Sequence, residues 1–124
     1  MGDRVSISFG NGGEESVALF NHWGGMGFVK EAERYARKLV RRNVGKENRT
    51  MYPLDRLEPE TVIVDFIRHI TSEMDSVDSN LYLCKDSMGG DNSDNGHHII
   101  ELDNLLAEEQ GAYAEYMADM REDR

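Results

Sequence analysis

The sequence predicts an α+β domain in which helices pack on one face of a four-stranded antiparallel sheet. Short strand-like segments occur near the start of the chain and again after its middle. Longer segments with apolar residues at helical spacing lie between and after them, and turn-forming residues separate the segments. The predicted order is ββ-α-α-ββ-α, with two β-hairpins supplying the four strands. A length of 124 residues fits a single domain, residues 1–124.

The first hairpin is predicted near the N-terminus. Val5, Ile7 and Phe9 alternate with polar residues, which is the period of a strand with one buried face. Residues 11–13, Asn-Gly-Gly, are a strong turn signal because asparagine and glycine adopt positive φ at little cost. The segment Ser16–Phe20 then returns as the second strand.

Two helices are predicted in the middle of the chain. The first begins at Phe28 or Val29 and ends before Gly45, which suits a C-terminal cap. The second begins at Pro59, a favoured residue in the first turn of a helix, and its apolar spacing persists to Met74. A polar connection joins the two helices.

The second hairpin is predicted from two short apolar strands, at residues 81–84 and 97–102. The segment between them, residues 85–96, has no periodic pattern, so we expect a mobile hairpin loop. Asp103 is a suitable N-cap for a final helix. The tail of that helix, residues 121–124, is expected to fray.

The composition restricts the class of protein. The formal net charge is −10 at pH 7, and acidic surroundings repel nucleic acid, so direct nucleic-acid binding is not expected. No apolar run approaches the roughly 18 to 20 residues that a membrane span needs. The N-terminus lacks the basic start and apolar centre of a signal peptide. We therefore expect a cytoplasmic protein, and the single cysteine, which cannot form an internal disulfide, agrees with this.

Positive charge is concentrated in one region of this acidic chain. Most basic residues lie between Lys30 and Arg56. The basic patch on the first predicted helix consists of Arg34, Arg37, Lys38, Arg41 and Arg42. We expect this patch to dock on the protein's own acidic surface or on a second copy, with an anion site as the alternative.

The most polar stretch of the chain, GGDNSDNGHH at residues 89–98, suggests a metal site by its composition. The calcium-binding EF-hand pattern nevertheless fails at two positions. When Gly96 is aligned with the invariant glycine, His98 replaces the aliphatic residue and Leu102 replaces the closing glutamate. Calcium binding by this loop is therefore not expected.

A divalent transition metal is the alternative for this stretch, because such metals accept imidazole and carboxylate ligands. The candidate ligands are Asp91, Asp94, His97 and Glu101. Adjacent histidines point to opposite faces of a strand, so His97 and His98 cannot both serve one metal. The simpler prediction is a strand end without a cofactor.

A glycine-rich segment, NHWGGMGF at residues 21–28, is the second candidate site. A glycine-rich turn before a helix can present backbone N–H groups to phosphate, but its spacing matches neither the dinucleotide-binding glycines nor the P-loop. The simpler prediction is a tight connection in which Trp23 and Phe28 fill the end of the core. If the segment is functional, its exposed tryptophan makes it a recognition element. The recognition candidates are His22, Trp23, Gly24 and Gly25.

Catalytic motifs are incomplete in this sequence. Cys84 falls within a predicted strand and is expected to be a buried, inert thiol, and no G-x-S-x-G sequence occurs. The final helix carries an apolar stripe, interpreted as core or as a dimer seam: Tyr113, Tyr116, Met117 and Met120.

The sequence therefore favours a small acidic protein that acts through interaction or regulation without catalysis, with another protein or with itself as a homodimer. Two alternatives stay open. One is a metal-dependent or phosphate-binding enzyme that uses residues 22–27 and the Asp/His/Glu cluster of residues 91–101. The other is an acidic protein that imitates nucleic acid.

Overall fold

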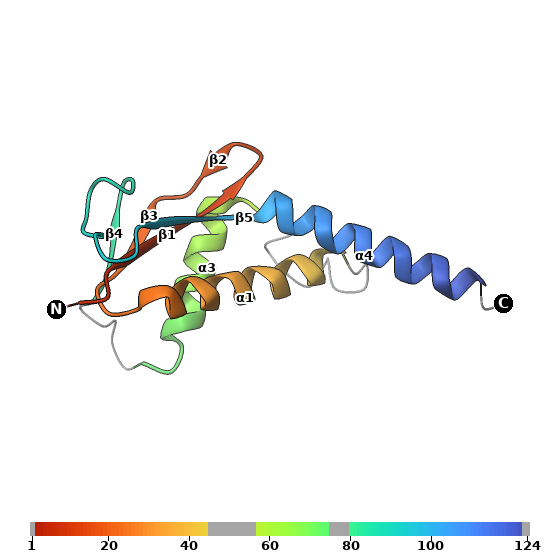
Figure 1. The fold of residues 1–124 in the computed structure, drawn as a ribbon, viewed down its shortest axis with the longest axis horizontal. Helices are drawn as coiled ribbons and strands as arrows, with labels where there is room; N and C mark the ends of the chain where they lie inside the picture. The colour runs from red at the N-terminus through yellow and green to blue at the C-terminus, as the bar shows by residue number, and fades with distance from the viewer. Residues whose placement is uncertain (1, 45–56, 75–79, 123–124) are drawn as a thin grey trace.

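The computed structural model describes residues 2–44, 57–74 and 80–122 (Figure 1). These residues form a mixed α+β fold with an open sheet of five strands and three helices. This confirms the predicted α+β class, but the sheet has one strand more than predicted and one of its strand pairings is parallel. The strands are β1 (Val5–Asn11), β2 (Glu14–Glu15), β3 (Ala18–Asn21), β4 (Leu81–Cys84) and β5 (His97–Glu101), and the helices are α1 (Gly25–Val44), α3 (Pro59–Thr71) and α4 (Leu102–Glu122).

The first hairpin forms as the sequence predicts, and it contains a β-bulge. Gly10 lies opposite Glu15, whereas Ile7 lies opposite Leu19, so the returning strand holds one extra residue. β2 and β3 are therefore two parts of one returning strand. Ser16 compensates for the interruption: its N–H donates to the Phe9 carbonyl at 2.8 Å, and its Oγ accepts from the Phe9 N–H at 3.0 Å.

The second predicted hairpin does not form. β4 pairs antiparallel with β3, whereas β5 pairs parallel with β1. Gly10 pairs with Glu15 of β2 and also with Glu101 of β5, so these two strands lie on opposite sides of β1. β4 and β5 are consequently at opposite edges of the sheet. Residues 85–96 cross from one edge to the other instead of closing a hairpin (Figure 1).

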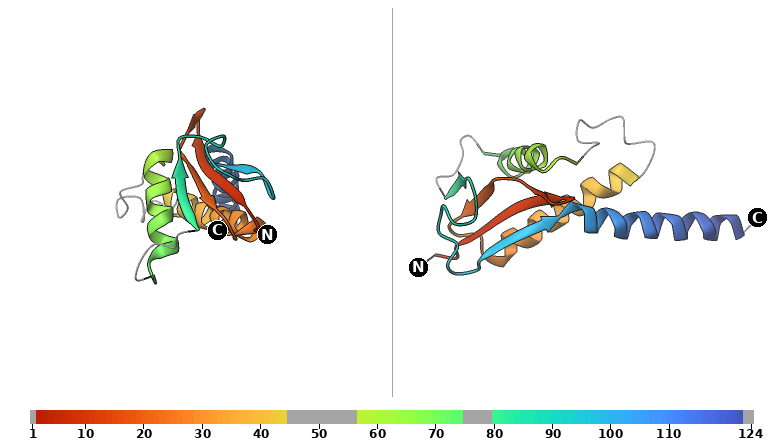
Figure 2. Two further views of the ribbon diagram at one scale, coloured as in Figure 1. Left: turned by 90° about the vertical axis from the view of Figure 1, so that its left-hand side faces the viewer. Right: turned by 90° about the horizontal axis from the view of Figure 1, so that it is seen from above.

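One face of the sheet packs against helices α1 and α3 (Figure 2). Val5, Ile7 and Phe9 point to this face because alternate residues of a strand share a side. The Phe66 ring of α3 lies 5.6 Å from the Phe9 ring and 5.8 Å from the Phe28 ring of α1, measured between ring centroids. The aromatic cluster therefore joins β1, α1 and α3 into one core, with the helices on the face that the sequence predicts.

The other face of the sheet is covered without a helix in the described part of the chain. Ser6, Ser8 and Phe20 have no exposed surface on this face. The Tyr82 ring stacks on Phe20 with a centroid distance of 5.0 Å. The Asn92 amide of the crossing segment donates to Ser6 Oγ at 2.9 Å. Residues 85–96 therefore form part of the cover of this face.

The helix boundaries differ slightly from the predicted ones. α1 begins at Gly25, before the predicted start, and α3 ends at Thr71, one turn before Met74. α4 begins at Leu102, directly after β5, so Asp103 lies in its first turn and is not an N-cap. The predicted cap Gly45 and the end of the predicted frayed tail, residues 123–124, lie outside the described residues.

The C-terminal half of α4 extends beyond the rest of the described chain (Figures 1 and 2). Its N-terminal half packs against the core through Leu105 and Leu106. The residues after Gln110 are exposed, apart from the partly covered Met117, as far as their side chains are described. None of the described helices is both long enough and apolar enough to cross a membrane.

Candidate functional site

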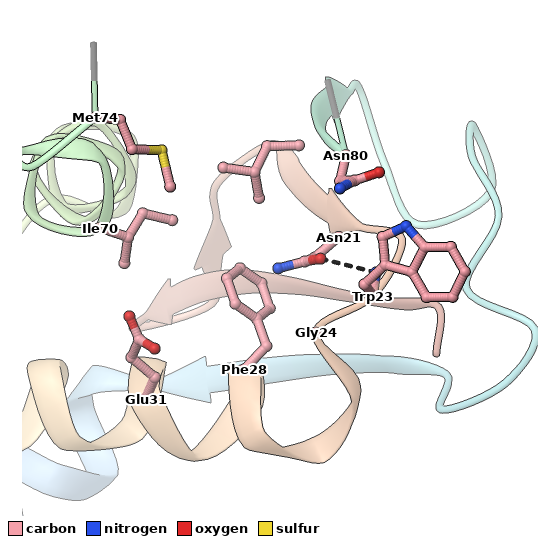
Figure 3. Close-up of a pocket in the computed structure, with 9 residues that line it drawn as sticks. Asn21, Trp23, Gly24, Phe28, Glu31, Ile70, Met74 and Asn80 are labelled. Carbon is pink, nitrogen blue, oxygen red and sulfur yellow. Dashed lines mark hydrogen bonds between the residues drawn. The ribbon is translucent and has the colours of Figure 1, made fainter. Parts of the chain in front are cut away.

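The segment between β3 and α1 lines a pocket of about 320 Å³ (Figure 3). α3, the residues that follow it and the start of β4 complete the wall. The lining residues are Asn21, Trp23, Gly24, Phe28, Glu31, Ile70, Met74, Asn80 and Leu81. Two of the predicted recognition candidates, Trp23 and Gly24, therefore line the pocket. His22 lies beside it, with its ring 4.6 Å from the Trp23 ring between centroids.

Local hydrogen bonding and close contacts set the shape of this segment. The Asn21 Oδ1 atom accepts from the Trp23 N–H at 3.0 Å, which turns the chain away from β3. A Cβ atom on Gly24 would lie 2.7 Å from both Asn21 Nδ2 and Phe28 Cβ, so only glycine fits without rearrangement. Trp23 is 55% exposed, and its indole stands at the rim of the pocket.

The N-terminus of α1 carries negative charge from another part of the chain. The Gly25 N–H donates to the Asp3 carbonyl at 2.9 Å, and a Cβ atom on Gly25 would lie 2.8 Å from Asp3 Oδ2. The Asp3 carboxylate therefore lies beside the first residue of α1, where its negative charge would repel a phosphate at this helix end. This arrangement weakens the case for an anion site at residues 22–27.

Both glycine-rich segments lie at the same end of the sheet. The Asn95 amide donates to Asp3 Oδ1 at 3.3 Å, and Arg4 binds both aspartates of the second segment. The Arg4 Nε atom is 3.1 Å from Asp91 Oδ2, and the Arg4 N–H donates to Asp94 Oδ2 at 2.9 Å. The pocket beside Trp23, however, has no wall from residues 85–97.

The proposed metal ligands are separated into three groups. Asp91 and Asp94 face Arg4, His97 faces the sheet, and Glu101 lies at the far end of β5 next to Gly10. No group of three or more His, Cys, Asp and Glu side chains suited to a metal is found among the described residues. The hydrogen bonds from Ser93 and the charge of Arg4 lower the pKa of Asp91, because both stabilise its carboxylate.

His97 is the centre of a polar cluster on the sheet face opposite α1 and α3. Its Nδ1 atom is 2.7 Å from Ser6 Oγ, and its Nε2 atom is 3.1 Å from Ser8 Oγ and 3.2 Å from Glu15 Oε2. Ser8 Oγ also donates to Glu15 Oε2 at 2.6 Å. His98 turns the other way, with Nε2 2.8 Å from the Asn95 carbonyl, so the two histidines face apart as the sequence predicts.

The polar cluster has the residue types of a nucleophilic triad but not its accessibility. A substrate carbonyl must reach the serine oxygen, and both Ser6 and Ser8 are fully buried. We therefore interpret the cluster as a set of satisfied polar groups that ties β5 to β1 and β2. The sequence did not predict it, because His97 lies about 90 residues from its serine partners. Serines at alternate positions of β1 were the only signal.

Two further side chains that could take part in chemistry, Tyr35 and Cys84, lie away from the pocket. Tyr35 donates to Asp65 Oδ2 at 2.6 Å, and burial, followed by this contact, raises the pKa of Tyr35 above its ordinary value. Cys84 is half-buried in the edge strand β4, less enclosed than the buried thiol that the sequence predicts. Neither group lines the pocket beside Trp23.

Two residues of the basic patch pair with acidic residues of the same chain, which is one of the two arrangements that the sequence predicts for the whole patch. Arg37 Nη1 is 3.1 Å from Glu108 Oε2, and Arg41 Nε is 3.1 Å from Glu109 Oε1. These ion pairs join α1 to the N-terminal half of α4. Arg34, Lys38 and Arg42 are also exposed on α1. The positive charge therefore extends beyond the part of α1 that pairs with α4.

The predicted apolar stripe of α4 remains largely uncovered in the structure. Tyr113, Tyr116 and Met120 are exposed by 37%, 59% and 48%, respectively, and Met117 is partly covered. The same helix face carries Leu105 and Leu106, which pack against the core. The face of α4 that packs against the core in its N-terminal half is therefore exposed in its C-terminal half, as far as the described residues show.

Comparisons with known proteins do not add a second source of information. The chain matches no protein family model, no curated protein and no solved structure at a significant level. The function of the chain must therefore be inferred from the geometry of its pocket, its polar cluster and the α4 stripe.

Proposed function

We propose that this chain is a small acidic interaction protein without catalytic activity, which associates with a second copy of itself through α4. The observation that carries this proposal is the exposed stripe of Tyr113, Tyr116 and Met120 on the half of α4 that extends from the domain. Contiguous apolar surface on a protein typically marks an interaction site.

The spacing of the stripe supports a helical partner. Positions on this face recur at alternating spacings of four and three residues, which is the heptad pattern of paired helices. The positions are Leu102, Leu106, Glu109, Tyr113, Tyr116 and Met120. In the first half of α4 this face packs on the domain itself. In the second half, another helix with the same spacing would bury it.

The distribution of charge supports an antiparallel second copy. The exposed acids Glu115 and Asp119 lie on the projecting half of α4, and Arg41 and Arg42 lie in the last turn of α1. The Arg41–Glu109 ion pair places that basic turn beside the middle of α4. An antiparallel α4 from a second copy would bring its acidic end to this turn, whereas a parallel copy would bring acid next to acid.

The alternatives receive less support from the described residues. An enzyme that uses the 22–27 and 91–101 segments would need an accessible metal or nucleophile. Instead, Arg4 binds Asp91 and Asp94, and Ser6 and Ser8 are buried beneath His97. Imitation of nucleic acid remains an untested alternative, since it needs only acidic surface.

The substitution Tyr116→Lys tests the proposed association. Only the projecting half of α4 would take part in the proposed contact, so we expect a weak dimer, with Kd on the order of 10 µM. Sedimentation velocity over a range of concentrations should show a monomer–dimer equilibrium for the unchanged chain. A buried lysine on each side of the contact should shift the dissociation constant by at least about ten-fold, because the two ammonium groups lose water and repel each other.

The matched control is Ala118→Lys. Ala118 is exposed and lies two residues beyond Tyr116, on the opposite side of the helix. This variant carries the same added charge in the same turn and should dimerise like the unchanged chain. A strictly monomeric unchanged chain, or equal dissociation constants for both variants, would contradict the proposal.

A further inference from the structure

The pocket beside Trp23 is a separate feature from the α4 stripe. We infer that it binds a small arylalkylammonium ion, with the ammonium group at Glu31 and the aromatic ring against Phe28 and Trp23. The size of the pocket, its apolar walls and the one charged residue in its described lining support this ligand class. The inference does not depend on self-association through α4.

The size and walls of the pocket suit a small ligand with an apolar body. A volume of about 320 Å³ is at the lower end of the range for small-molecule sites. Ile70 and Met74 lie on one side of the Phe28 ring (Figure 3), and Leu81 also lines the pocket. The Phe28 ring lies between Glu31 and the Trp23 indole (Figure 3). A ligand that lies along Phe28 would therefore reach Glu31 with one end and Trp23 with the other.

The charge of the pocket selects a cation. In the described part of the chain, Glu31 is the only charged residue in the lining. Among the described residues no ion-pair partner of Glu31 is found, so its carboxylate is available to a ligand. Asp3 adds negative charge at the adjacent N-terminus of α1. An anionic ligand would therefore be repelled by the Glu31 carboxylate, and a cationic ligand would gain an ion pair with it.

The polar rim supplies orientation. The side chains of Asn21 and Asn80 lie on the side of the pocket near Trp23, and amide groups at such positions accept and donate hydrogen bonds. The exposed Trp23 indole gains apolar contact when an aromatic ring stacks on it. This gain also explains why a large apolar side chain stands in a glycine-rich turn without packing into the core.

Fluorescence titration tests the inference directly, because Trp23 is the only tryptophan of the chain. The probes are 2-phenylethylammonium, the neutral 2-phenylethanol and the anionic phenylacetate, with free N-acetyltryptophanamide as the reference for collisional quenching. We expect a saturable change for the ammonium ion with Kd on the order of 1 mM, the range expected of a ligand this small. The alcohol should bind more weakly, and phenylacetate should bind most weakly.

Glu31→Gln distinguishes the ion pair from apolar contact. It should weaken binding of the ammonium ion by about three-fold to ten-fold and leave binding of the alcohol nearly unchanged, since a partly exposed ion pair contributes about that much. Glu33→Gln, an exposed position on the same helix outside the lining, is the matched control and should change neither. Equal affinity for all three probes, no saturable change, or equal effects of the two substitutions would overturn the inference.

Discussion

The fold raises the pKa of the Tyr35 hydroxyl group. Tyr35 is half-buried and donates to Asp65, which also accepts from Arg68 at 2.9 Å. The fold therefore favours the neutral phenol, and the pKa of Tyr35 rises above its ordinary value of 10.0. A group with a raised pKa contributes its full stabilisation below its unfolded-state pKa and loses it as the pH rises further.

Tyr35→Phe should therefore change the alkaline limb of the stability curve. At neutral pH the variant loses one hydrogen bond, and we expect the free energy of unfolding to fall by about 1 kcal/mol. Above pH 10.0 the unchanged chain should lose stability as the unfolded tyrosine ionises, and the variant should lose less. Urea unfolding at neutral pH and at several alkaline values measures both effects. Parallel stability curves above pH 10.0 would contradict this account of Tyr35.

At the residue scale, the sequence singled out two residues of the pocket lining as recognition candidates, but its simpler prediction, that Trp23 fills the end of the core, is wrong because Trp23 is 55% exposed. Trp23 and Gly24 were recognisable because a tryptophan among glycines cannot pack regularly. Glu31 was not recognisable as a pocket residue, because acids on an exposed helix face usually lie in solvent. Its neighbours Ile70 and Leu81 come from elements far along the chain, and no local pattern relates them to α1.

At the scale of elements, the β-bulge after β2 shows how one side chain maintains a sheet. The extra residue displaces the hydrogen bonding of Phe9, whose backbone N–H would otherwise be buried without an acceptor. Ser16 Oγ is that acceptor, and Ser16 Oγ itself donates to the Val17 carbonyl at 2.9 Å. The serine thus replaces one missing bond of the ladder.

Ser16→Ala should destabilise the protein by about 1 to 3 kcal/mol, because it leaves the Phe9 N–H buried without a partner. Ser72→Ala is the matched control, since the Ser72 hydroxyl is exposed at the end of α3 and donates only to the His69 carbonyl. The control should lose less than about 0.5 kcal/mol. Chemical denaturation of the two variants provides the comparison, and equal losses would show that the bulge does not depend on Ser16.

The first hairpin and both central helices were predictable from sequence, and the pairing of the last two strands was not. Residues 11–13 fix the first turn locally, and the apolar spacing from Pro59 onward fixes α3. The sequences of strands as short as β4 and β5 determine neither the strand with which each pairs nor whether the pairing is parallel or antiparallel. Their pairing depends on β1, which accepts β5 on the edge that the first hairpin leaves open.

At the scale of the whole molecule, the two halves of α4 differ in how far they pack against the rest of the described chain. The N-terminal half of α4 is joined to α1 by ion pairs of Arg37 and Arg41 and to the core by leucines. The C-terminal half carries the exposed apolar stripe outward (Figure 1). The net charge of −10 opposes non-specific association, so a contact through this stripe would be selective for a partner with matching shape and charge.

Hydrogen exchange at low and high protein concentration tests self-association through α4 most directly. In a monomer, the backbone of residues 113–120 lacks packing partners in the described structure, so its amides should exchange rapidly. At high concentration we expect protection of this segment to rise, while β1 stays unchanged and Tyr116→Lys removes the rise. Protection of residues 113–120 that does not depend on concentration, or a rise confined to the edge strands β4 and β5, would contradict the account.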